Sequence, residues 1–169
     1  YNAFDDYIAQ ITTGADVDCL PVRAYRQLDA RFSGLELDVT YIVNDFVDLQ
    51  VFGDMVNGNL KDNGDAPRLP PSRLGARFNV DGDNWSAYLS VLHANEQDEP
   101  GNFELASKSY TRWDLGADYT LQLDKGSELM LFARGRNLGD DEIRLSPSYL
   151  RGFAPEAGRS LEVGLRFSY

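Results

Sequence analysis

Apolar and polar residues alternate with a period of two over most of this chain, and this pattern is typical of β-strands that have one apolar face. In the segment 35–41 every odd position is apolar and every even position is polar, and the segment 161–169 repeats this pattern up to the last residue. No amphipathic helix of useful length competes with the strands. The pattern predicts about eight strands, at 4–12, 35–41, 49–51, 74–80, 85–91, 113–123, 128–136 and 161–169.

The connections between these strands alternate in length. The short ones fall at 44–45, 81–84 and 124–126, and the long ones at 13–24, 57–72, 94–111 and 139–159. Membrane β-barrels sort their connections in this way, with tight periplasmic turns and long extracellular loops, whereas a soluble sandwich has no reason to do so. The sequence therefore predicts an all-β, antiparallel transmembrane β-barrel meander. The strand 128–136 has apolar residues on both faces, so its orientation stays open.

Aromatic residues at the apolar positions support a membrane environment. Most flank the short turns or the end of the chain, and one flanks a long connection, as in the two aromatic girdles of a membrane barrel. The alternative is that these rings form the core of a soluble sandwich. The residues of the first group are Tyr41, Phe78, Trp85, Phe167 and Tyr169, and the residue beside a long connection is Trp113.

Charge and composition exclude several functions. A formal net charge of -11 disfavours nucleic-acid binding, which needs clustered lysine and arginine. No apolar run is long enough for a transmembrane helix. The single cysteine, Cys19, cannot form a disulfide within the chain, and its role stays open. Residues 1–4 do not resemble a signal peptide, so the chain is expected to begin inside a strand of a mature or truncated product.

The sequence predicts no enzyme, no cofactor and no metal site. His93 lies at an apolar position near the end of its strand, where a histidine–serine–asparagine arrangement could hydrolyse lipid. No Gly-x-Ser-x-Gly signature accompanies it, so the role of His93 stays open. The acidic segments 62–65 and 95–99 could bind calcium, but the first lacks a full calcium-binding loop. Solvated loop charge is the simpler interpretation of both segments.

Charged residues at the polar positions predict a polar interior. In a wide barrel they would contact water, a plug or a passing substrate, whereas in a small closed barrel they would have to pair, because an unpaired buried charge is costly. Acidic residues outnumber arginines among them, which favours a wide, water-filled lumen and predicts that the isolated chain closes poorly. The predicted lumen-facing residues are Glu36, Asp38, Asp48, Arg77, Asp114, Asp118 and Arg166.

The last strand carries a glycine and two aromatic residues, Gly164, Phe167 and Tyr169. This ending resembles that of outer-membrane proteins, and the resemblance implies an assembly signal read by the barrel assembly machinery. A C-terminal strand with a complete apolar face can pair at an exposed sheet edge and then be sealed in lipid. With a periplasmic C-terminus, the connection 139–159 and the other long connections face outside.

Four segments resemble the TonB-dependent outer-membrane receptor family. The segment 137–141, Asn-Leu-Gly-Asp-Asp, is similar to the family's Asn-Leu-hydrophobic-Asp segment, although Gly139 stands where a larger residue is common. The segment 155–160, Pro-Glu-Ala-Gly-Arg-Ser, is similar to the segment that opens the family's final strand. The segments 30–36 and 66–75 resemble a strand entry and a proline-bearing loop of the same family.

This resemblance implies a receptor in the outer membrane of a Gram-negative bacterium, which takes up a scarce nutrient, such as a siderophore or a metal, with energy from TonB. The segment 146–150, followed by Ala154 and Pro155, is similar to receptors grouped with zinc-uptake proteins, and the ligand stays open. Such receptors have a plug domain, a TonB box and about 22 strands. Neither plug nor TonB box is recognisable, so residues 1–169 are expected to be a C-terminal barrel segment that supplies wall, outer loops and assembly signal.

The expected partners follow from the same resemblance. They are outer-membrane lipid and lipopolysaccharide, the barrel assembly machinery, the nutrient, and TonB through the missing plug. The alternative is a stand-alone small outer-membrane barrel with a structural or adhesive role, because about eight strands suffice to close a barrel around side chains.

Overall fold

A computed structural model describes residues 1–101 and 104–169, with Lys125 described by its backbone alone. The described residues form strands and one short 3-10 helix, which confirms the predicted all-β class. The elements are β1 (Asn2–Val17), β2 (Leu20–Asn44), β3 (Val47–Leu60), β4 (Gly64–Asp65), β5 (Arg73–Asp81), β6 (Trp85–Ala94), β7 (Tyr110–Gln122), η1 (Asp124–Gly126), β8 (Glu128–Arg136) and β9 (Ser160–Ser168). Within the described residues, no helix has the length and apolar character needed to span a membrane.

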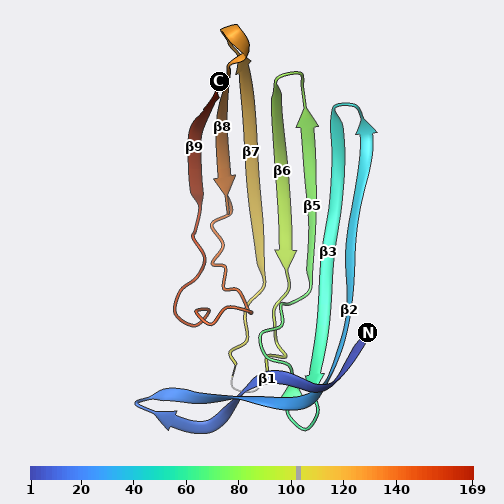
Figure 1. Cartoon of the computed structure of the whole chain (residues 1–169), viewed down its shortest axis with the longest axis vertical. Coiled ribbons are helices and arrows are strands. Elements are labelled where there is room, and N and C mark those ends of the chain that lie inside the picture. The colour runs from blue at the N-terminus through green and yellow to red at the C-terminus, as the bar shows by residue number, and fades with distance from the viewer. Residues whose placement is uncertain (102–103) are drawn as a thin grey trace.

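The long strands form one antiparallel sheet in which each strand pairs with the next, in the order β1-β2-β3-β5-β6-β7-β8-β9, and the two residues of β4 pair with β3. This order confirms the predicted meander of about eight strands. Within the described residues, β1 pairs only with β2, and β9 pairs only with β8. The sheet therefore has two free edges and is not closed (Figure 1).

The sheet has two parts. β1 pairs with the first half of β2, from the pair Val17–Leu20 to the pair Asn2–Phe32, and we call this part the hairpin. The remainder of β2 with β3 and β5 to β9 forms the wall. Figure 1 shows the hairpin running across one end of the wall rather than along it. The strand predicted at 4–12 is present, but it lies in the hairpin and not in the wall.

The prediction of a long connection at 13–24 is wrong. β1 and β2 run through this segment and meet in a tight turn at Asp18 and Cys19. Both turn residues have positive φ angles, 51° and 64°, as the tightest hairpin turns require. The strands on either side of the turn are mostly exposed on both faces. No apolar face was therefore needed there, and the alternation that marks the wall strands is missing.

The three short turns lie at one end of the wall together with the C-terminus, and the long connections lie at the other end (Figure 1). The Phe46 amide donates to the Asn44 side chain at 2.9 Å and so closes the β2–β3 turn. In the β5–β6 turn the Gly82 amide donates to the Trp85 carbonyl at 2.8 Å. Apart from the hairpin, the predicted sorting of short and long connections is confirmed.

The wall has one apolar and one polar face. Cross-strand partners in an antiparallel sheet point to the same side, and the register carries apolar rows across the sheet. Leu49 pairs with Tyr41 and Phe78, and Leu89 pairs with Phe78 and Leu115. Leu89 and Leu115 remain 43% and 48% exposed because no second layer covers them. So broad an exposed apolar surface is stable only in an apolar environment such as lipid.

The register also resolves the orientation of β8, which the sequence left open. The residues of β8 on the apolar face are Leu129, Leu131, Ala133 and Gly135, paired with Phe167, Leu165, Val163 and Leu161 of β9. Met130, Phe132 and Arg134 therefore lie on the polar face, because successive side chains of a strand alternate.

Three aromatic rings on the polar face lie over glycines of a neighbouring strand. The pairs are Phe52 with Gly75, Tyr88 with Gly116, and Phe132 with Gly164, and a Cβ atom on the glycine would lie 2.5, 2.3 and 2.4 Å from the ring, respectively. These distances are too short for a real Cβ atom. Glycine at these positions therefore lets the rings lie flat and pack against the backbone.

Replacing Gly164 by alanine is expected to destabilise the wall by about 1–3 kcal/mol, because the added methyl group displaces the Phe132 ring. In a Phe132→Ala background the same replacement should cost much less. Guanidinium unfolding in detergent micelles of the unchanged protein, the two single variants and the double variant measures both costs. An equal cost of Gly164→Ala in the two backgrounds would show that the glycine is not needed for Phe132.

Buried side chains are concentrated at the end of the wall that carries the long connections. One cluster surrounds the fully buried Leu60 and joins the hairpin to the connection 61–72, and it consists of Ala9, Ala30, Leu60 and Ala66. A second cluster consists of Ala94, Tyr110 and Ile143. The single-layered wall has no second layer to bury side chains against, so the long connections supply the packed core.

Candidate functional site

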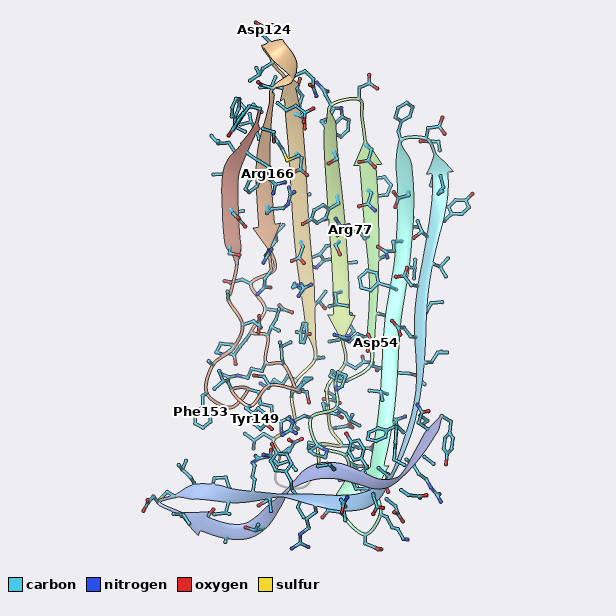
Figure 2. All side chains as sticks on the ribbon, viewed as in Figure 1. Asp54, Arg77, Asp124, Tyr149, Phe153 and Arg166 are labelled. Atoms are coloured by element: carbon cyan, nitrogen blue, oxygen red, sulfur yellow. The ribbon has the colours of Figure 1, made fainter. Side chains whose placement is uncertain are left out.

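The seven charged residues predicted to face a lumen all lie on the polar face of the wall. The register pairs each of them with positions on the side opposite the apolar rows. They are Glu36 and Asp38 on β2, Asp48 on β3, Arg77 on β5, Asp114 and Asp118 on β7, and Arg166 on β9. Figure 2 shows Arg77 near the middle of the wall and Arg166 nearer the short turns.

Side-chain amides hold two of these carboxylates. Gln50 donates to both oxygens of Asp38, at 3.0 and 3.1 Å. Asn79 donates to Asp48 at 2.8 Å and accepts a hydrogen bond from Arg77 Nε at 2.9 Å. The amides satisfy the carboxylates without neutralising them, so this part of the polar face keeps negative charge.

Three further arginines of the polar face, each paired with a carboxylate, were not identified from the sequence. Their guanidinium groups bind carboxylates, and the pairs are Arg73 with Asp54 at 2.8 Å, Arg112 with Asp114 at 2.9 Å, and Arg134 with Asp118 at 2.6 Å. The predicted shortage of inward arginines is therefore wrong. Arg134 escaped notice because its strand has apolar residues on both faces, and the other two lie at the starts of strands, beside long connections.

Tyr88 lies at the centre of the polar face between two cationic groups. The guanidinium carbon of Arg77 is 3.7 Å from the centre of its ring, and that of Arg134 is 5.8 Å away. Arginine is attracted to the face of an aromatic ring. Arg134 also donates two hydrogen bonds to Asp118, at 2.6 and 2.9 Å. These contacts fix the positions of three charged groups before any ligand or partner arrives.

An open groove of about 790 Å³ runs along the polar face toward the short turns. Its lining includes Arg136, Glu162 and Arg166, for which no ion pair is formed within the described residues. The groove therefore offers charges of both signs to whatever occupies this side of the wall.

Two of the four segments that carried the family resemblance, 137–141 and 155–160, form one anchor at the long-connection end. Asn137 is 2% exposed, and its side-chain amide donates to the carbonyls of Asp141 and Ala157, at 2.9 and 3.4 Å. The Asp141 carboxylate accepts the Thr111 amide at 2.8 Å. The Asp140 carboxylate accepts the Arg159 amide at 2.8 Å. The motif residues thus tie both ends of the connection 137–159 to each other and to β7.

A buried ion pair joins two of the long connections. The side chains of Glu104 and Arg151 are 4% and 10% exposed, and their charged atoms lie 3.6 Å apart. Glu104 also accepts the Arg68 amide at 2.8 Å. Arg151 donates to the Ser146 carbonyl at 2.7 Å. We call the connections 61–72, 95–101 with 104–109, and 137–159 the loop cluster, because these contacts hold them together.

Exposed charges in the same region have shifted pKa values. The hydrogen bond and the positive charge of Lys61 lower the pKa of Asp29, and the same pairing raises the pKa of Lys61. Arg144 lowers the pKa of Glu142 in the same way. Because the pKa of Asp29 is lowered by folding, its contribution to stability is present at neutral pH and is lost as the pH falls through that lowered pKa. Solvent weakens such exposed pairs.

The remaining candidate residues do not form a recognisable reactive centre. His93 is exposed, and its Nδ1 atom lies 2.9 Å from the Thr111 hydroxyl. Cys19 is free and exposed at the tip of the hairpin. Within the described residues, no three or more His, Cys, Asp or Glu side chains gather closely enough to hold a metal ion.

The predicted assembly-signal residues lie on two faces of β9. Gly164 is on the polar face beneath Phe132. Phe167 pairs with Leu129 on the apolar face, and its ring centre lies 6.3 Å from that of Tyr169. The two aromatic residues therefore extend the apolar surface to the end of the chain.

A single-layered antiparallel sheet with an apolar outer surface, a charged inner surface and sorted connections is the wall of a membrane β-barrel. Residues 1–138 match the family model described as TonB dependent receptor-like, beta-barrel, and the chain belongs to this family. The family is one of outer-membrane receptor barrels, in agreement with the fold.

The fold is also found in a solved structure, that of "Copper transporter OprC". The two structures superpose with a TM-score of 0.78 at 17% sequence identity. The match covers 96% of this chain and 27% of the OprC chain. No curated protein sequence matches. At this identity the likeness concerns the fold, and the chain spans about a quarter of the transporter's length.

Proposed function

We propose that this chain is a C-terminal wall segment of a TonB-energised outer-membrane receptor that takes up a scarce nutrient. The segment supplies barrel wall, outer loops and the assembly signal. The observation that carries this proposal is the one-sided sheet with two free edges. The alternative is a small closed barrel with a structural or adhesive role. Such a barrel would need its first and last strands to pair, and the described residues contain no such pair.

The wall is proposed to continue through further strands at both free edges. On one side, β1 turns into the hairpin, so β2 has no outer neighbour beyond Phe32. On the other side, β9 has no neighbour beyond β8. Unpaired strand edges are stable in lipid only when another strand covers them, which supports a larger barrel.

In this barrel the polar face lines the lumen. Its charges are suited to contact with water and with a plug domain, because the amide-bound carboxylates and the free charges of the groove remain available for hydrogen bonds. The apolar face contacts lipid, and the long connections meet lipopolysaccharide and nutrient outside the cell. The barrel assembly machinery recognises the end of β9.

The nutrient is proposed to be a siderophore, a metal or a compound of similar scarcity. Growth of a strain that lacks the complete protein, on media limited in turn for iron, copper and zinc, tests this proposal. We expect slower growth on one of these media. Restoring the gene should restore growth in cells with TonB and fail in cells without it. Restoration that does not depend on TonB would contradict energised uptake.

A further inference from the structure

Three segments that are distant in the sequence meet at Tyr149 of the connection 137–159 (Figure 2). The Tyr149 hydroxyl donates to Gln10 Oε1 in the hairpin at 2.8 Å and accepts a hydrogen bond from Arg68 of the connection 61–72. Arg68 also donates to Gln10 Oε1 at 2.8 Å. Its guanidinium carbon lies 4.4 Å from the centre of the Tyr149 ring, and that of Arg23 lies 6.0 Å away. Gln10 Oε1 therefore accepts hydrogen bonds from both Tyr149 and Arg68.

The hairpin is attached to the rest of the molecule on both of its faces. Ala9 and Ile11 pack into the apolar cluster around Leu60. Gln10 lies between them in the strand, so its side chain leaves the opposite face, where it meets Tyr149 and Arg68. The first attachment is apolar and involves Ala9 and Ile11, which lie midway along the hairpin on either side of Gln10. The second is polar, and its Tyr149 lies 139 residues from Gln10 in the sequence.

The hairpin also has a point at which it bends. The register of β1 with β2 shifts between Phe4 and Tyr7, and Asp6 has a φ angle of 61°. A β-bulge of this kind bends a strand and increases its twist. Figure 1 shows the hairpin leaving the direction of the wall and crossing its end. A two-stranded ribbon with such a bend keeps a fixed direction only where it packs against other segments.

We propose that Tyr149 is a latch that fixes the hairpin across the long-connection end of the wall. With the latch closed, the position of the hairpin is tied to that of the connection 137–159. When the contacts of Tyr149 with Arg68 and Gln10 break, only the apolar contacts of Ala9 and Ile11 still hold this part of the hairpin, and the hairpin moves about the bulge over a wider range of positions. This inference goes beyond the proposed uptake function and stands if that function is wrong.

Cys19 offers a direct way to measure the position of the hairpin. It is exposed at the hairpin tip, and a second label at Asp83→Cys reports from the opposite end of the wall. Pulsed electron paramagnetic resonance gives the distance between the two spin labels in the full-length protein, reconstituted in phospholipid vesicles. We expect one narrow distance peak for the otherwise unchanged protein and a broad, shifted distribution for Tyr149→Ala. Tyr149→Phe keeps the ring over Arg68 and loses the hydroxyl, so it should broaden the peak less.

Tyr25→Ala is the matched control. Tyr25 pairs with Gln10 in the hairpin, is 72% exposed, and forms no hydrogen bond or ring contact within the described residues, so its peak should remain narrow. A second pair of labels, at Asp45→Cys and Asp83→Cys with Cys19→Ser, reports whether the wall is intact in each variant. If Tyr149→Ala disturbs the wall, the same distance measurement on Gln10→Ala tests the proposal instead. A peak that stays narrow in Gln10→Ala, or in a Tyr149→Ala protein with an intact wall, overturns the proposal.

Discussion

Arginine in place of Leu89 is expected to destabilise the folded wall by about 2–4 kcal/mol, the cost of placing a charged side chain on the lipid face near the middle of a bilayer. Leu89 lies in the middle of β6, and its cross-strand neighbours Phe78 and Leu115 are apolar. The arginine would have no carboxylate within the row to bind. Guanidinium unfolding of the full-length protein in phospholipid vesicles measures the loss.

Ser90→Arg is the control for this prediction. Ser90 follows Leu89 in the same strand but lies on the polar face, where it pairs with Arg77 and Asp114. An arginine there meets water and a carboxylate, so its cost should stay below about 1 kcal/mol. Equal losses for the two variants would mean that the apolar face does not contact lipid.

Alanine in place of Arg151 is expected to open the loop cluster. Arg151 is the partner of Glu104, whose side chain is 4% exposed. Removing one member of a buried ion pair costs about 3–5 kcal/mol, because the other charge is left without compensation. A surface loop has little local stability to oppose this cost. The connection 137–159 should therefore unfold locally while the wall remains intact.

Limited proteolysis of the full-length protein in outer-membrane vesicles tests this expectation. Cleavage within 139–159 should become much faster in Arg151→Ala and stay unchanged in Arg159→Ala. Arg159 belongs to the same connection, but its contact with Asp140 is 3.9 Å long and half exposed, so it contributes little. Similar cleavage of both variants would show that the buried pair does not hold the loops.

The wall could be predicted from the sequence because a membrane imposes one apolar face on each strand. The segment 85–91 shows this alternation clearly, and its strand, β6, extends only three residues further, to Ala94. The hairpin could not be predicted in the same way. From Thr13 to Val17 and from Leu20 to Arg23 its strands face solvent on most positions, so nothing selects an alternating pattern there.

The pairing on the polar face and in the loop cluster depends on register and on distant segments. The sequence identified Asp114 and Asp118 as polar-face residues. The pairing of Asp114 with Arg112 of the same strand depends on rotamers, and the pairing of Asp118 with Arg134 depends on the alignment of β7 with β8. The contact between Gln10 and Tyr149 spans nearly the whole chain and leaves no local signal. The family motif at 137–141 could be recognised, whereas its role as an anchor for Ala157 and Arg159 required the structure.

The central claim is that the wall spans the outer membrane with its short turns toward the periplasm. Labelling of single cysteines in intact cells, with a maleimide too large to cross the outer membrane, tests it directly. Cys19 in the hairpin and Phe153→Cys in the connection 137–159 should react in intact cells. Asp124→Cys, at the opposite end of the wall (Figure 2), and Asp83→Cys, in the β5–β6 turn at that same end, should react only after the outer membrane is permeabilised. All variants other than the first carry Cys19→Ser. Reaction of the short-turn cysteines in intact cells, with the long-connection cysteines protected, would contradict the claim.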